Sequence, residues 1–248
     1  MKILGVIPAR YASTRFPGKP LVVIDGKTMI RRVYEQSLKC DALTDTVVAT
    51  DDEAIFKHVR LFNGNVLMTD PHHRSGTSRC SEVVEKLGKS GQYYDYVINI
   101  QGDEPFIDPE QIRQVAKCFE NTEIQLATLI KKITDPADLI NPNVVKVVVD
   151  NNGSALFFSR SPIPFKRGMD QDAWLTAATY YKHIGIYGYQ SPVLKKIVDL
   201  KETPLEAAES LEQLRWIENG FRIQTHVTEF ESIAIDAPAD LLKITNRS

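Results

Sequence analysis

The sequence predicts an α/β protein with a mostly parallel central sheet and a smaller β-rich insertion. Short runs rich in Val, Ile and Leu alternate with longer amphipathic stretches through the first half of the chain, which is the pattern of βαβ units. After residue 124, strand-like segments follow one another without helices between them. A chain of 248 residues is long enough to bury one large core. We therefore expect a single domain over residues 1–248.

The first half of the chain is predicted to alternate strands and helices. Apolar runs predict strands at Ile3–Ile7, Thr46–Ala49, Val66–Met68 and Tyr96–Ile100. The last of these runs is apolar on both faces, as a central strand should be. Amphipathic periodicity predicts helices at Met29–Lys39, Glu53–Phe62 and Ser78–Leu87, and a further helix that begins at Asp108. Parallel sheets are built from units in this order.

Capping residues mark the starts of these helices. Asp108-Pro109-Glu110-Gln111 combines an Asp cap, Pro at the first helical position and Gln three residues after the cap, so it is the best marked boundary in the chain. Asp51 and Asp52 are the candidate caps of the second helix, and Thr77 is the candidate cap of the third.

The second half of the chain is predicted to be richer in strands. The expected strands are Gln125–Ile133, Val144–Val149, Ala155–Ser159, Tyr180–Tyr189, Ile223–Val227 and Ile233–Ile235. The turn Asn151-Asn152-Gly153 joins the second and third of them as a hairpin. Segment Ser161–Ala173 contains two prolines and a glycine and predicts a mobile loop. Helices are predicted at Val193–Leu200 and Leu205–Glu218, and from Pro238 onward.

Composition restricts the classes of function. Thirty basic against thirty-two acidic residues leave a net charge of −2, which is too weak a field to hold nucleic acid or an anionic membrane. No segment approaches the roughly 18 apolar residues of a membrane span, and Ile3–Ile7 is too short for the core of a signal peptide. Cys40, Cys80 and Cys118 are odd in number and widely spaced, which favours a reducing compartment. We therefore expect a soluble, cytoplasmic protein.

A cationic loop follows the first predicted strand. Arg10, Arg15 and Lys19 fall within ten residues, together with the hydroxyl groups of Ser13 and Thr14. Open α/β sheets bind ligands beyond the carboxyl ends of their strands, where this loop should lie, and these groups would suit a triphosphate. The alternative is a solvated basic loop. The loop contains neither a P-loop motif nor Gly-x-Gly-x-x-Gly, which argues against a P-loop NTPase and against a dinucleotide site.

Two aspartates are candidate metal ligands. Asp103 lies in Gln101-Gly102-Asp103-Glu104-Pro105, directly after the fourth predicted strand, and Asp236 follows the last one. A site with carboxylates and without histidine or thiol suits Mg²⁺, which takes one or two carboxylates plus substrate phosphates. Two converging carboxylates repel each other unless a cation lies between them, so a bound metal would explain both. The alternative is that each aspartate caps a helix or forms a turn.

The cationic loop, IPARYASTRFPGKPL, resembles the N-terminal signature of the 3-deoxy-manno-octulosonate (Kdo) cytidylyltransferases, the CMP-Kdo synthetases. Seven further runs resemble this family in its own order: His73–Thr77, Asn99–Pro105, Asn141–Lys146, Phe157–Arg160, His183–Tyr189, Leu211–Arg215 and Ile235-Asp236. The resemblance implies a Rossmann-like nucleotidyltransferase fold of the GT-A-like kind and a homodimer. It also implies that the region of about residues 140–190 serves sugar binding and dimerisation.

The resemblance implies roles for individual residues as well. The nucleotide would be bound by Pro8, Ala9, Arg10, Ser13, Arg15, Lys19, Arg74, Ser75, Gly76 and Gln101. The sugar acid would be bound by Gln101, Arg160, His183, Tyr187, Glu212 and Gln213. Arg160 has a planar guanidinium group that can bind the sugar carboxylate through two hydrogen bonds. The resemblance pairs Asp103 and Asp236 as ligands of Mg²⁺. From the residues alone, a helix cap, a structural histidine or the polar face of a helix would explain several of these positions.

The implied reaction is attack by the anomeric hydroxyl of Kdo on the α-phosphorus of CTP, with release of pyrophosphate. Arg10 and Lys19 would hold the phosphates, and Asp103 and Asp236 would hold Mg²⁺, without a covalent intermediate. Related alternatives are activation of 8-amino-Kdo or sialic acid. Alternatives of another class are a GT-A-type glycosyltransferase, which would consume a sugar nucleotide, and a nucleotide sensor, which would bind CTP without turnover.

Overall fold

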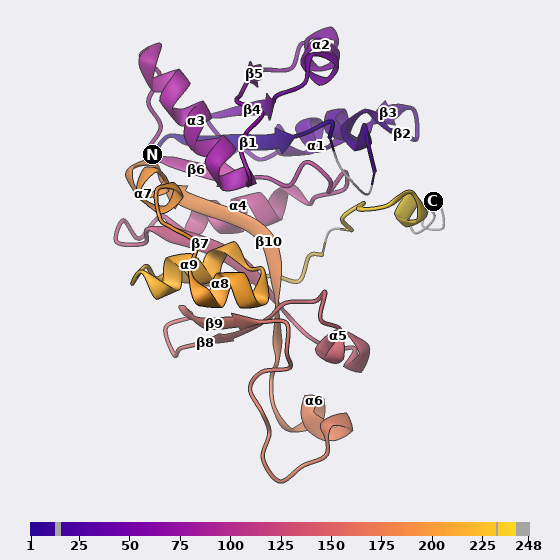
Figure 1. Cartoon of the computed structure of the whole chain (residues 1–248), viewed down its shortest axis with the longest axis vertical. Coiled ribbons are helices and arrows are strands. Elements are labelled where there is room, and N and C mark those ends of the chain that lie inside the picture. The colour runs from indigo at the N-terminus through magenta and orange to yellow at the C-terminus, as the bar shows by residue number, and fades with distance from the viewer. Residues whose placement is uncertain (13–15, 232, 242–248) are drawn as a thin grey trace.

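In the part of the chain that the structure describes, one mixed sheet of nine strands runs through the centre of the protein (Figure 1). The structure is a computed structural model, and it describes residues 1–12, 16–231 and 233–241. The main path of the sheet has the order β11-β7-β10-β6-β1-β4-β5. Its strands are β1 (Ile3–Ala9), β4 (Asp45–Thr50), β5 (Val66–Met68), β6 (Tyr96–Asn99), β7 (Leu126–Lys132), β10 (Tyr181–Gln190) and β11 (Ile223–Val227).

Helices cover both faces of this sheet. The apolar side chains of α1 (Met29–Ser37), α2 (Glu53–Leu61) and α4 (Pro109–Cys118) join one buried cluster with the sheet. Those of α3 (Gly76–Lys89), α7 (Ser191–Val198) and α9 (Glu212–Glu218) join the other. The predicted capping box of α4 is confirmed, because the Asp108 side chain accepts a hydrogen bond from the backbone of the first turn and the Gln111 side chain accepts one from the backbone N–H of Asp108. The layers are those expected of a doubly wound sheet.

The parallel strands position the functional edge of the molecule. β1 pairs in parallel with β4 and with β6, and β4 pairs in parallel with β5. Their carboxyl ends therefore lie along one edge, and the loops that begin at Arg10, Asp51, Thr69 and Ile100 all start there. Ligands of open α/β sheets bind at such an edge.

Strand β10 connects the main sheet to the β-rich insertion. On one side it pairs antiparallel with β7 along most of its length. On its other side its second half pairs antiparallel with β6, and Tyr181 and Lys182 pair with β8 (Lys146–Val149). The register between β10 and β7 shifts between Ile184 and Tyr187, which marks a bulge. β8 and β9 (Ala155–Ser159) form the predicted hairpin, which projects away from the main sheet with α5 (Pro136–Ile140) and α6 (Trp174–Ala177) (Figure 1). The role of residues of about 140–190 in sugar binding and dimerisation stays a prediction.

Five local predictions are corrected by the structure, the last of them at the C-terminus. The single helix expected at Leu205–Glu218 is two helices, α8 (Pro204–Glu209) and α9, because Ser210 adopts a left-handed conformation with φ 52°. Residues 233–235 are not a strand, since Ile235 packs into a small cluster with Ile24 and Met29 instead of joining the sheet. The expected loop before β10 contains a short 3₁₀ turn at Gln171–Ala173.

The fourth correction concerns a helix cap. Ser75, not Thr77, caps α3, because the Ser75 side chain accepts a hydrogen bond from the backbone N–H of Ser78. Thr77 lies in the first turn of the helix, where its hydroxyl contacts Glu212 instead. A cap can be displaced by two residues when several hydroxyl-bearing residues stand together, as they do here.

Several short elements were not predicted from the sequence. These are the small hairpin of β2 (Val23–Ile24) and β3 (Lys27–Thr28), helices α5 and α6, and the 3₁₀ turn Lys19–Leu21. At the C-terminus, the helix expected from Pro238 is a 3₁₀ turn over Pro238–Leu241. Elements of two to five residues carry too little periodicity to be recognised in a sequence.

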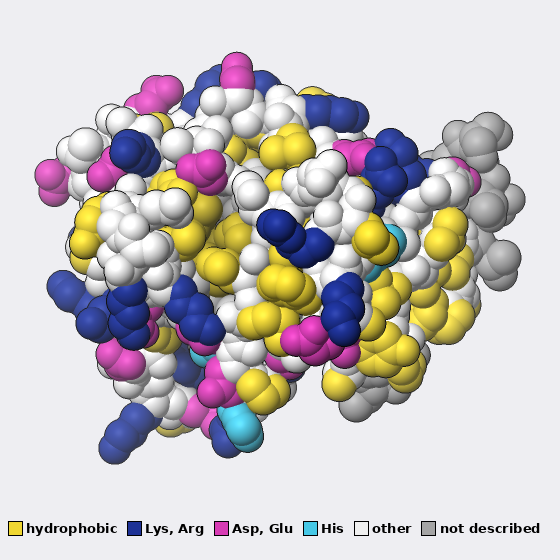
Figure 2. All heavy atoms as spheres, turned by 90° about the horizontal axis from the view of Figure 1, so that it is seen from above, with side chains coloured by type: hydrophobic (Ala, Val, Ile, Leu, Met, Phe, Trp, Pro, Cys, Tyr) yellow, Lys and Arg dark blue, Asp and Glu magenta, His cyan; other side chains and the backbone are white. Residues whose placement is uncertain are grey.

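The surface agrees with the near-neutral composition. Seen from above in Figure 2, Lys and Arg side chains are interspersed with Asp and Glu side chains over the visible face. No helix in the described part of the chain has both the length and the apolar character that a bilayer crossing needs. Cys40, Cys80 and Cys118 are all free, and Cys40 and Cys80 are buried.

Candidate active site

A polar cavity of about 430 Å³ lies at the carboxyl ends of the parallel strands. The loops after β1 and β6, the start of α3 and the segment around Asp236 form its walls. Nine of the predicted site residues line it: Pro8, Ala9, Arg10, Lys19, Ser75, Gly76, Gln101, Asp103 and Asp236. The sheet therefore brings the predicted phosphate loop and both predicted metal ligands to one place.

The first loop presents its cations from a constrained backbone. Gly18 adopts φ 69°, a conformation that residues with a side chain rarely take, and its N–H donates to the carbonyl of Tyr11 at 3.0 Å. Lys19 then begins the 3₁₀ turn, in which Pro20 is buried. Arg10 is exposed at the cavity rim and donates to the carbonyl of His73 at 3.5 Å. The predicted nucleotide contacts at Ser13 and Arg15 lie outside the described residues.

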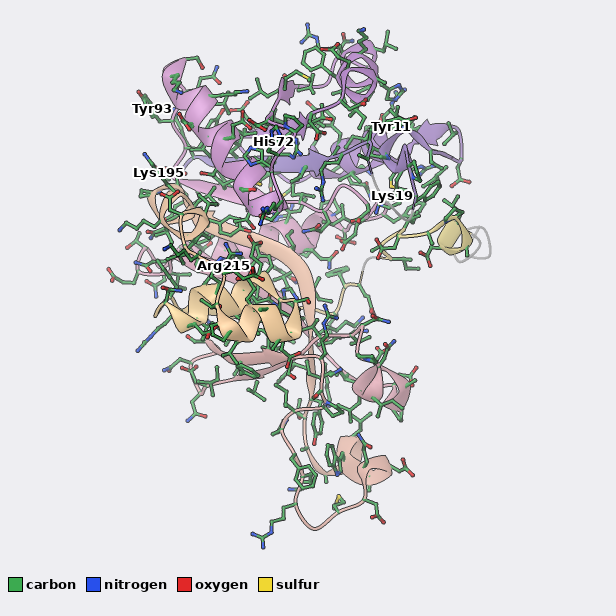
Figure 3. All side chains as sticks on the ribbon, viewed as in Figure 1. Tyr11, Lys19, His72, Tyr93, Lys195 and Arg215 are labelled. Carbon is green, nitrogen blue, oxygen red and sulfur yellow. The ribbon has the colours of Figure 1, made fainter. Side chains whose placement is uncertain are left out.

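Lys19, which is labelled in Figure 3, forms ion pairs with both predicted metal ligands. Its Nζ is 2.8 Å from Asp103 Oδ2 and 3.4 Å from Asp236 Oδ1. The Lys19 side chain is 13% exposed, against 26% for Asp103 and 43% for Asp236. The two carboxylates thus point at a common position, although they are separated by more than a hundred residues in the chain.

Backbone hydrogen bonds fix this convergence. The N–H of Ile235 donates to the carbonyl of Asp103 at 2.9 Å, which ties the segment before Asp236 to the loop after β6. Asp240 Oδ2 then accepts from the N–H groups of Asp236 and Ala237 at 3.0 and 2.9 Å. Asp236 is therefore held from both sides, by a long-range contact and by a local turn.

Two glycines allow the walls of the cavity to approach each other closely. A Cβ on Gly102 would lie 2.4 Å from the carbonyl oxygen of Pro8, which is well inside van der Waals contact. A Cβ on Gly76 would lie 3.0 Å from Asn99 Nδ2. Gly102 therefore sets how near Asp103 stands to the β1 loop.

Hydrogen bonds join the start of α3 to helix α9, which packs on the same face of the sheet. The Glu212 carboxylate accepts from Ser75 Oγ at 2.9 Å and from Thr77 Oγ1 at 2.7 Å. A carboxylate next to the first turn of a helix is stabilised by the helix dipole. Arg74 and Glu212 line a neighbouring cavity of about 670 Å³, and Ser75 belongs to both cavities.

Arg79 is a residue of the cavity that sequence reasoning missed. It projects from α3, is 1% exposed, and lines the cavity together with the first loop. Its guanidinium donates to Thr69 and pairs with Asp51 at 3.3 Å. A buried guanidinium facing a polar cavity is suited to an anion. The only signal in the sequence is an arginine on the otherwise apolar face of the predicted third helix.

The predicted sugar residues form a second group next to the cavity. Gln101 reaches toward them, because its Nε2 donates to the carbonyl of Gly185 at 2.7 Å. His183 lies between Phe158 and Tyr187, with ring centroids 5.3 and 5.1 Å away. Gln213 is buried, and the buried hydroxyl of Tyr187 has no hydrogen-bond partner among the described residues. None of His183, Tyr187 and Gln213 lines either of the two cavities.

The guanidinium of Arg160 is already hydrogen-bonded within the protein. It donates to the backbone carbonyls of Glu209 at 2.7 Å, Pro142 at 2.9 Å and Ser210 at 3.4 Å. In return, the Glu209 carboxylate accepts from Ser159 Oγ at 2.6 Å and from the N–H of Arg160 at 2.9 Å. In this structure Arg160 therefore holds the corner between α8 and α9, and its predicted role as carboxylate anchor requires these bonds to rearrange.

His183 makes folding stability depend on pH. Burial lowers the pKa of His183 to about 4, and its Nε2 lies 3.0 Å from Thr128 Oγ1. Below the ordinary histidine pKa of about 6.5, His183 binds a proton in the unfolded chain but stays neutral in the folded protein. The free energy of unfolding therefore falls as the pH falls toward about 4. We therefore expect His183→Gln to reduce the stability difference between pH 7 and pH 5 by about 1 kcal/mol.

Urea unfolding at the two pH values measures this effect. His226→Gln, at an exposed position of β11, is the matched control and should keep the wild-type pH dependence. An unchanged pH dependence in His183→Gln would show that another group is responsible.

The residues present fit a divalent cation of the Mg²⁺ type. The two converging carboxylates supply only oxygen donors, and the described residues contain no cluster of three or more histidine, cysteine or acidic side chains that would suit a tighter all-protein site. Mg²⁺ is commonly bound by one or two carboxylates, with phosphates and water completing the shell. The site is therefore chemically suited to a metal that arrives with a polyphosphate.

Comparison with known proteins agrees with this geometry. The protein family described as Cytidylyltransferase matches residues 4–227. The chain is 53% identical over 247 residues to the 3-deoxy-manno-octulosonate cytidylyltransferase of Parabacteroides distasonis, covering 98% of this chain and 96% of the relative. It is 54% identical over 244 residues to the protein of the same name from Bacteroides thetaiotaomicron, covering 97% and 96%.

Solved structures give the same result. A CMP:2-keto-3-deoxy-manno-octonic acid synthetase complexed with CTP superposes with a TM-score of 0.91 at 41% identity, covering 99% of this chain and 98% of the other. A 4-diphosphocytidyl-2C-methyl-D-erythritol synthase from Anaerococcus prevotii, with 15% identity, 99% and 95% coverage and a TM-score of 0.63, shares the fold. The predicted nucleotidyltransferase fold is thereby confirmed. With 53% identity over nearly the full length of both proteins, the chain belongs to the 3-deoxy-manno-octulosonate cytidylyltransferase family.

Proposed function

We propose that the protein transfers CMP from CTP to Kdo and releases pyrophosphate. The observation that carries this proposal is the convergence of Lys19, Asp103 and Asp236 in one polar cavity, with Lys19 Nζ within 3.4 Å of both carboxylates. A cation and two carboxylates at the carboxyl edge of a parallel sheet suit a metal-bound triphosphate. Relatives named for this reaction match the whole chain, which supports CTP and Kdo as its substrates.

Arg10, Lys19 and Arg79 are the proposed phosphate-binding cations. All three line the cavity, and Arg79 is held rigidly by its contacts to Thr69 and Asp51. An attractive charge about 4 Å from a phosphate contributes about 4 kcal/mol at an effective dielectric constant of ~20, so three local cations outweigh a near-neutral surface. Catalysis of this kind rests on positioning and charge neutralisation.

Asp103 and Asp236 are the proposed ligands of Mg²⁺. When bound, Mg²⁺ supplies Lewis-acid polarisation of the transferred phosphoryl group. The protein contributes the fixed spacing of the two carboxylates, which the hydrogen bond from the N–H of Ile235 to the carbonyl of Asp103 sets. No side chain is required to form a covalent bond with the substrate.

The proposed sugar site lies beyond Gln101, next to the phosphate cavity. Gln101 links the two regions through its bond to Gly185, and Glu212 joins α9 to the start of α3. The buried Tyr187 hydroxyl, which has no partner among the described residues, would be satisfied by a sugar hydroxyl. Arg160, Glu212, Gln213 and His183 complete the proposed set. We propose β10 and the loop before it as the dimer arm of a homodimer.

Pyrophosphate release tests this function. The purified protein is given each of the four nucleoside triphosphates with Mg²⁺, and with Kdo, 8-amino-Kdo or sialic acid. We expect release with CTP and Kdo, at a rate at least a hundredfold above that with the other nucleotides, because a base edge read by hydrogen bonds rejects analogues strongly. Reactions without sugar acid are the control.

The same experiment separates the alternatives. Release with 8-amino-Kdo or sialic acid but not with Kdo would change the acceptor. Binding of CTP without release under any condition would identify a nucleotide sensor. Consumption of CMP-Kdo in the presence of an acceptor, without activity on CTP and free sugar, would identify a glycosyltransferase.

A further inference from the structure

A positively charged side chain already lies where we propose that the metal binds. Lys19 Nζ contacts both Asp103 Oδ2, at 2.8 Å, and Asp236 Oδ1, at 3.4 Å. We propose that Lys19 is the internal counter-cation of the metal site, holding both carboxylates in place before the nucleotide binds and releasing them when the metal and triphosphate enter together. This inference rests on the proposed function and concerns the order in which the ligands bind.

The charges of the three groups explain why a counter-cation is needed. Two carboxylates that face one position repel each other, and the ammonium of Lys19 removes most of that repulsion. Lys19 is only 13% exposed, so its attraction to the carboxylates is screened less than that of a surface ion pair. The three groups together carry one negative charge. A divalent cation added to them would leave one positive charge in the site and would be repelled by Lys19.

An incoming triphosphate relieves this repulsion. It is strongly anionic, and the cavity that Lys19 lines also contains Arg10 and Arg79. The ammonium has a flexible stem and three donors, so it can turn from the carboxylates to a phosphate without a change in the backbone. Asp103 and Asp236 would then be available to hold the divalent cation. Metal and nucleotide therefore favour each other's binding.

The backbone around Lys19 limits the movement to its side chain. The N–H of Leu21 donates to the carbonyl of Gly18 at 2.9 Å, and the N–H of Val22 donates to the carbonyl of Lys19 at 3.1 Å. Pro20 is buried beneath the turn. A change of partners by the Lys19 side chain is therefore sufficient, without a change in this turn.

Direct metal titration tests this inference. Mn²⁺ is titrated into the nucleotide-free protein, and unbound Mn²⁺ is followed by electron paramagnetic resonance. We expect Lys19→Met to bind Mn²⁺ at least about tenfold more tightly than the wild type, because the competing charge is gone. Lys19→Arg keeps the charge and should bind as weakly as the wild type. Lys27→Met, which removes a surface lysine paired with Glu35, is the matched control and should not change Mn²⁺ affinity.

A double variant, a second neutral substitution and a check of folding make the result decisive. In the double variant Lys19→Met with Asp103→Asn, the tighter binding should disappear, and persistence would place the Mn²⁺ elsewhere and overturn the inference. Far-UV circular dichroism establishes that each variant is folded, and Lys19→Gln provides a second neutral substitution. Equal or weaker Mn²⁺ binding by both folded neutral variants would overturn the inference.

The outcome is independent of the test of the proposed function. If the wild type releases pyrophosphate from CTP and Kdo while the neutral variants bind Mn²⁺ no more tightly, the proposed function stands and the counter-cation role fails. If the wild type releases none but the variants bind Mn²⁺ more tightly at Asp103, the proposed function fails and the competition between Lys19 and the metal stands.

Discussion

Asp103→Asn is expected to lower the kcat for pyrophosphate release from CTP and Kdo by about a thousandfold or more. The substitution keeps the size of the side chain and removes the charge that would hold the metal against the transferred phosphoryl group. Metal ions contribute several kcal/mol of transition-state stabilisation, and each 1.4 kcal/mol corresponds to about a tenfold change in rate. A coupled pyrophosphate assay under saturating Mg²⁺ measures the loss.

The fold should survive this substitution. Asp103 is 26% exposed, and the backbone carbonyl that accepts from Ile235 is unchanged. Asp41→Asn is the matched control, because Asp41 is an exposed partner of Arg113 far from the cavity and should keep wild-type activity. Near-normal pyrophosphate release by a folded Asp103→Asn protein would contradict the assigned role.

Gly102→Ala is expected to lower kcat by about a hundredfold and to destabilise the protein by about 1–3 kcal/mol. The new Cβ would lie 2.4 Å from the carbonyl oxygen of Pro8. The clash is between two backbone segments attached to neighbouring central strands, so neither can give way as a flexible side chain would. The strands must separate locally, which moves Asp103 away from the β1 loop.

The two effects are measured by pyrophosphate release and by urea denaturation. Gly88→Ala is the control substitution. Its Cβ would be 3.6 Å from the nearest atom of Tyr93, an ordinary contact, and it lies in α3 away from the cavity. We expect full activity and unchanged or slightly higher stability, since alanine favours a helix over glycine. Wild-type kinetics in Gly102→Ala would show that the approach of the two loops is not needed.

Local sequence signals predicted most of the elements. The structure confirms the bounds of β5, β9 and β11 and the capping box of α4, because these depend on periodicity and on contacts between near neighbours. The break between α8 and α9 was missed because it depends on a contact between residues far apart in the chain. Residues on both sides of Ser210 favour a helix, and the left-handed turn is held by Arg160, which lies 50 residues earlier in the chain.

In the candidate site, too, some residues could be predicted from the sequence and others could not. The cationic loop and the Asp103 motif could be found because each follows a predicted strand, and the edge at which parallel strands end is known in advance. Arg79 could not be recognised as a cavity residue, since its exposure to the cavity depends on how α3 packs against the sheet. Nor did the sequence reveal that Arg160 is engaged by three backbone carbonyls.

The sequence by itself determined the fold class, the cationic first loop, the two candidate metal ligands and the family. It did so through short-range patterns and motifs, which are properties of neighbouring residues. Only the tertiary structure decided that Lys19 lies between Asp103 and Asp236, across separations of 84 and 217 residues. The physical reason is that such contacts follow from the pairing of β1 with β6 and from the docking of Ile235, which no local stretch of the chain encodes.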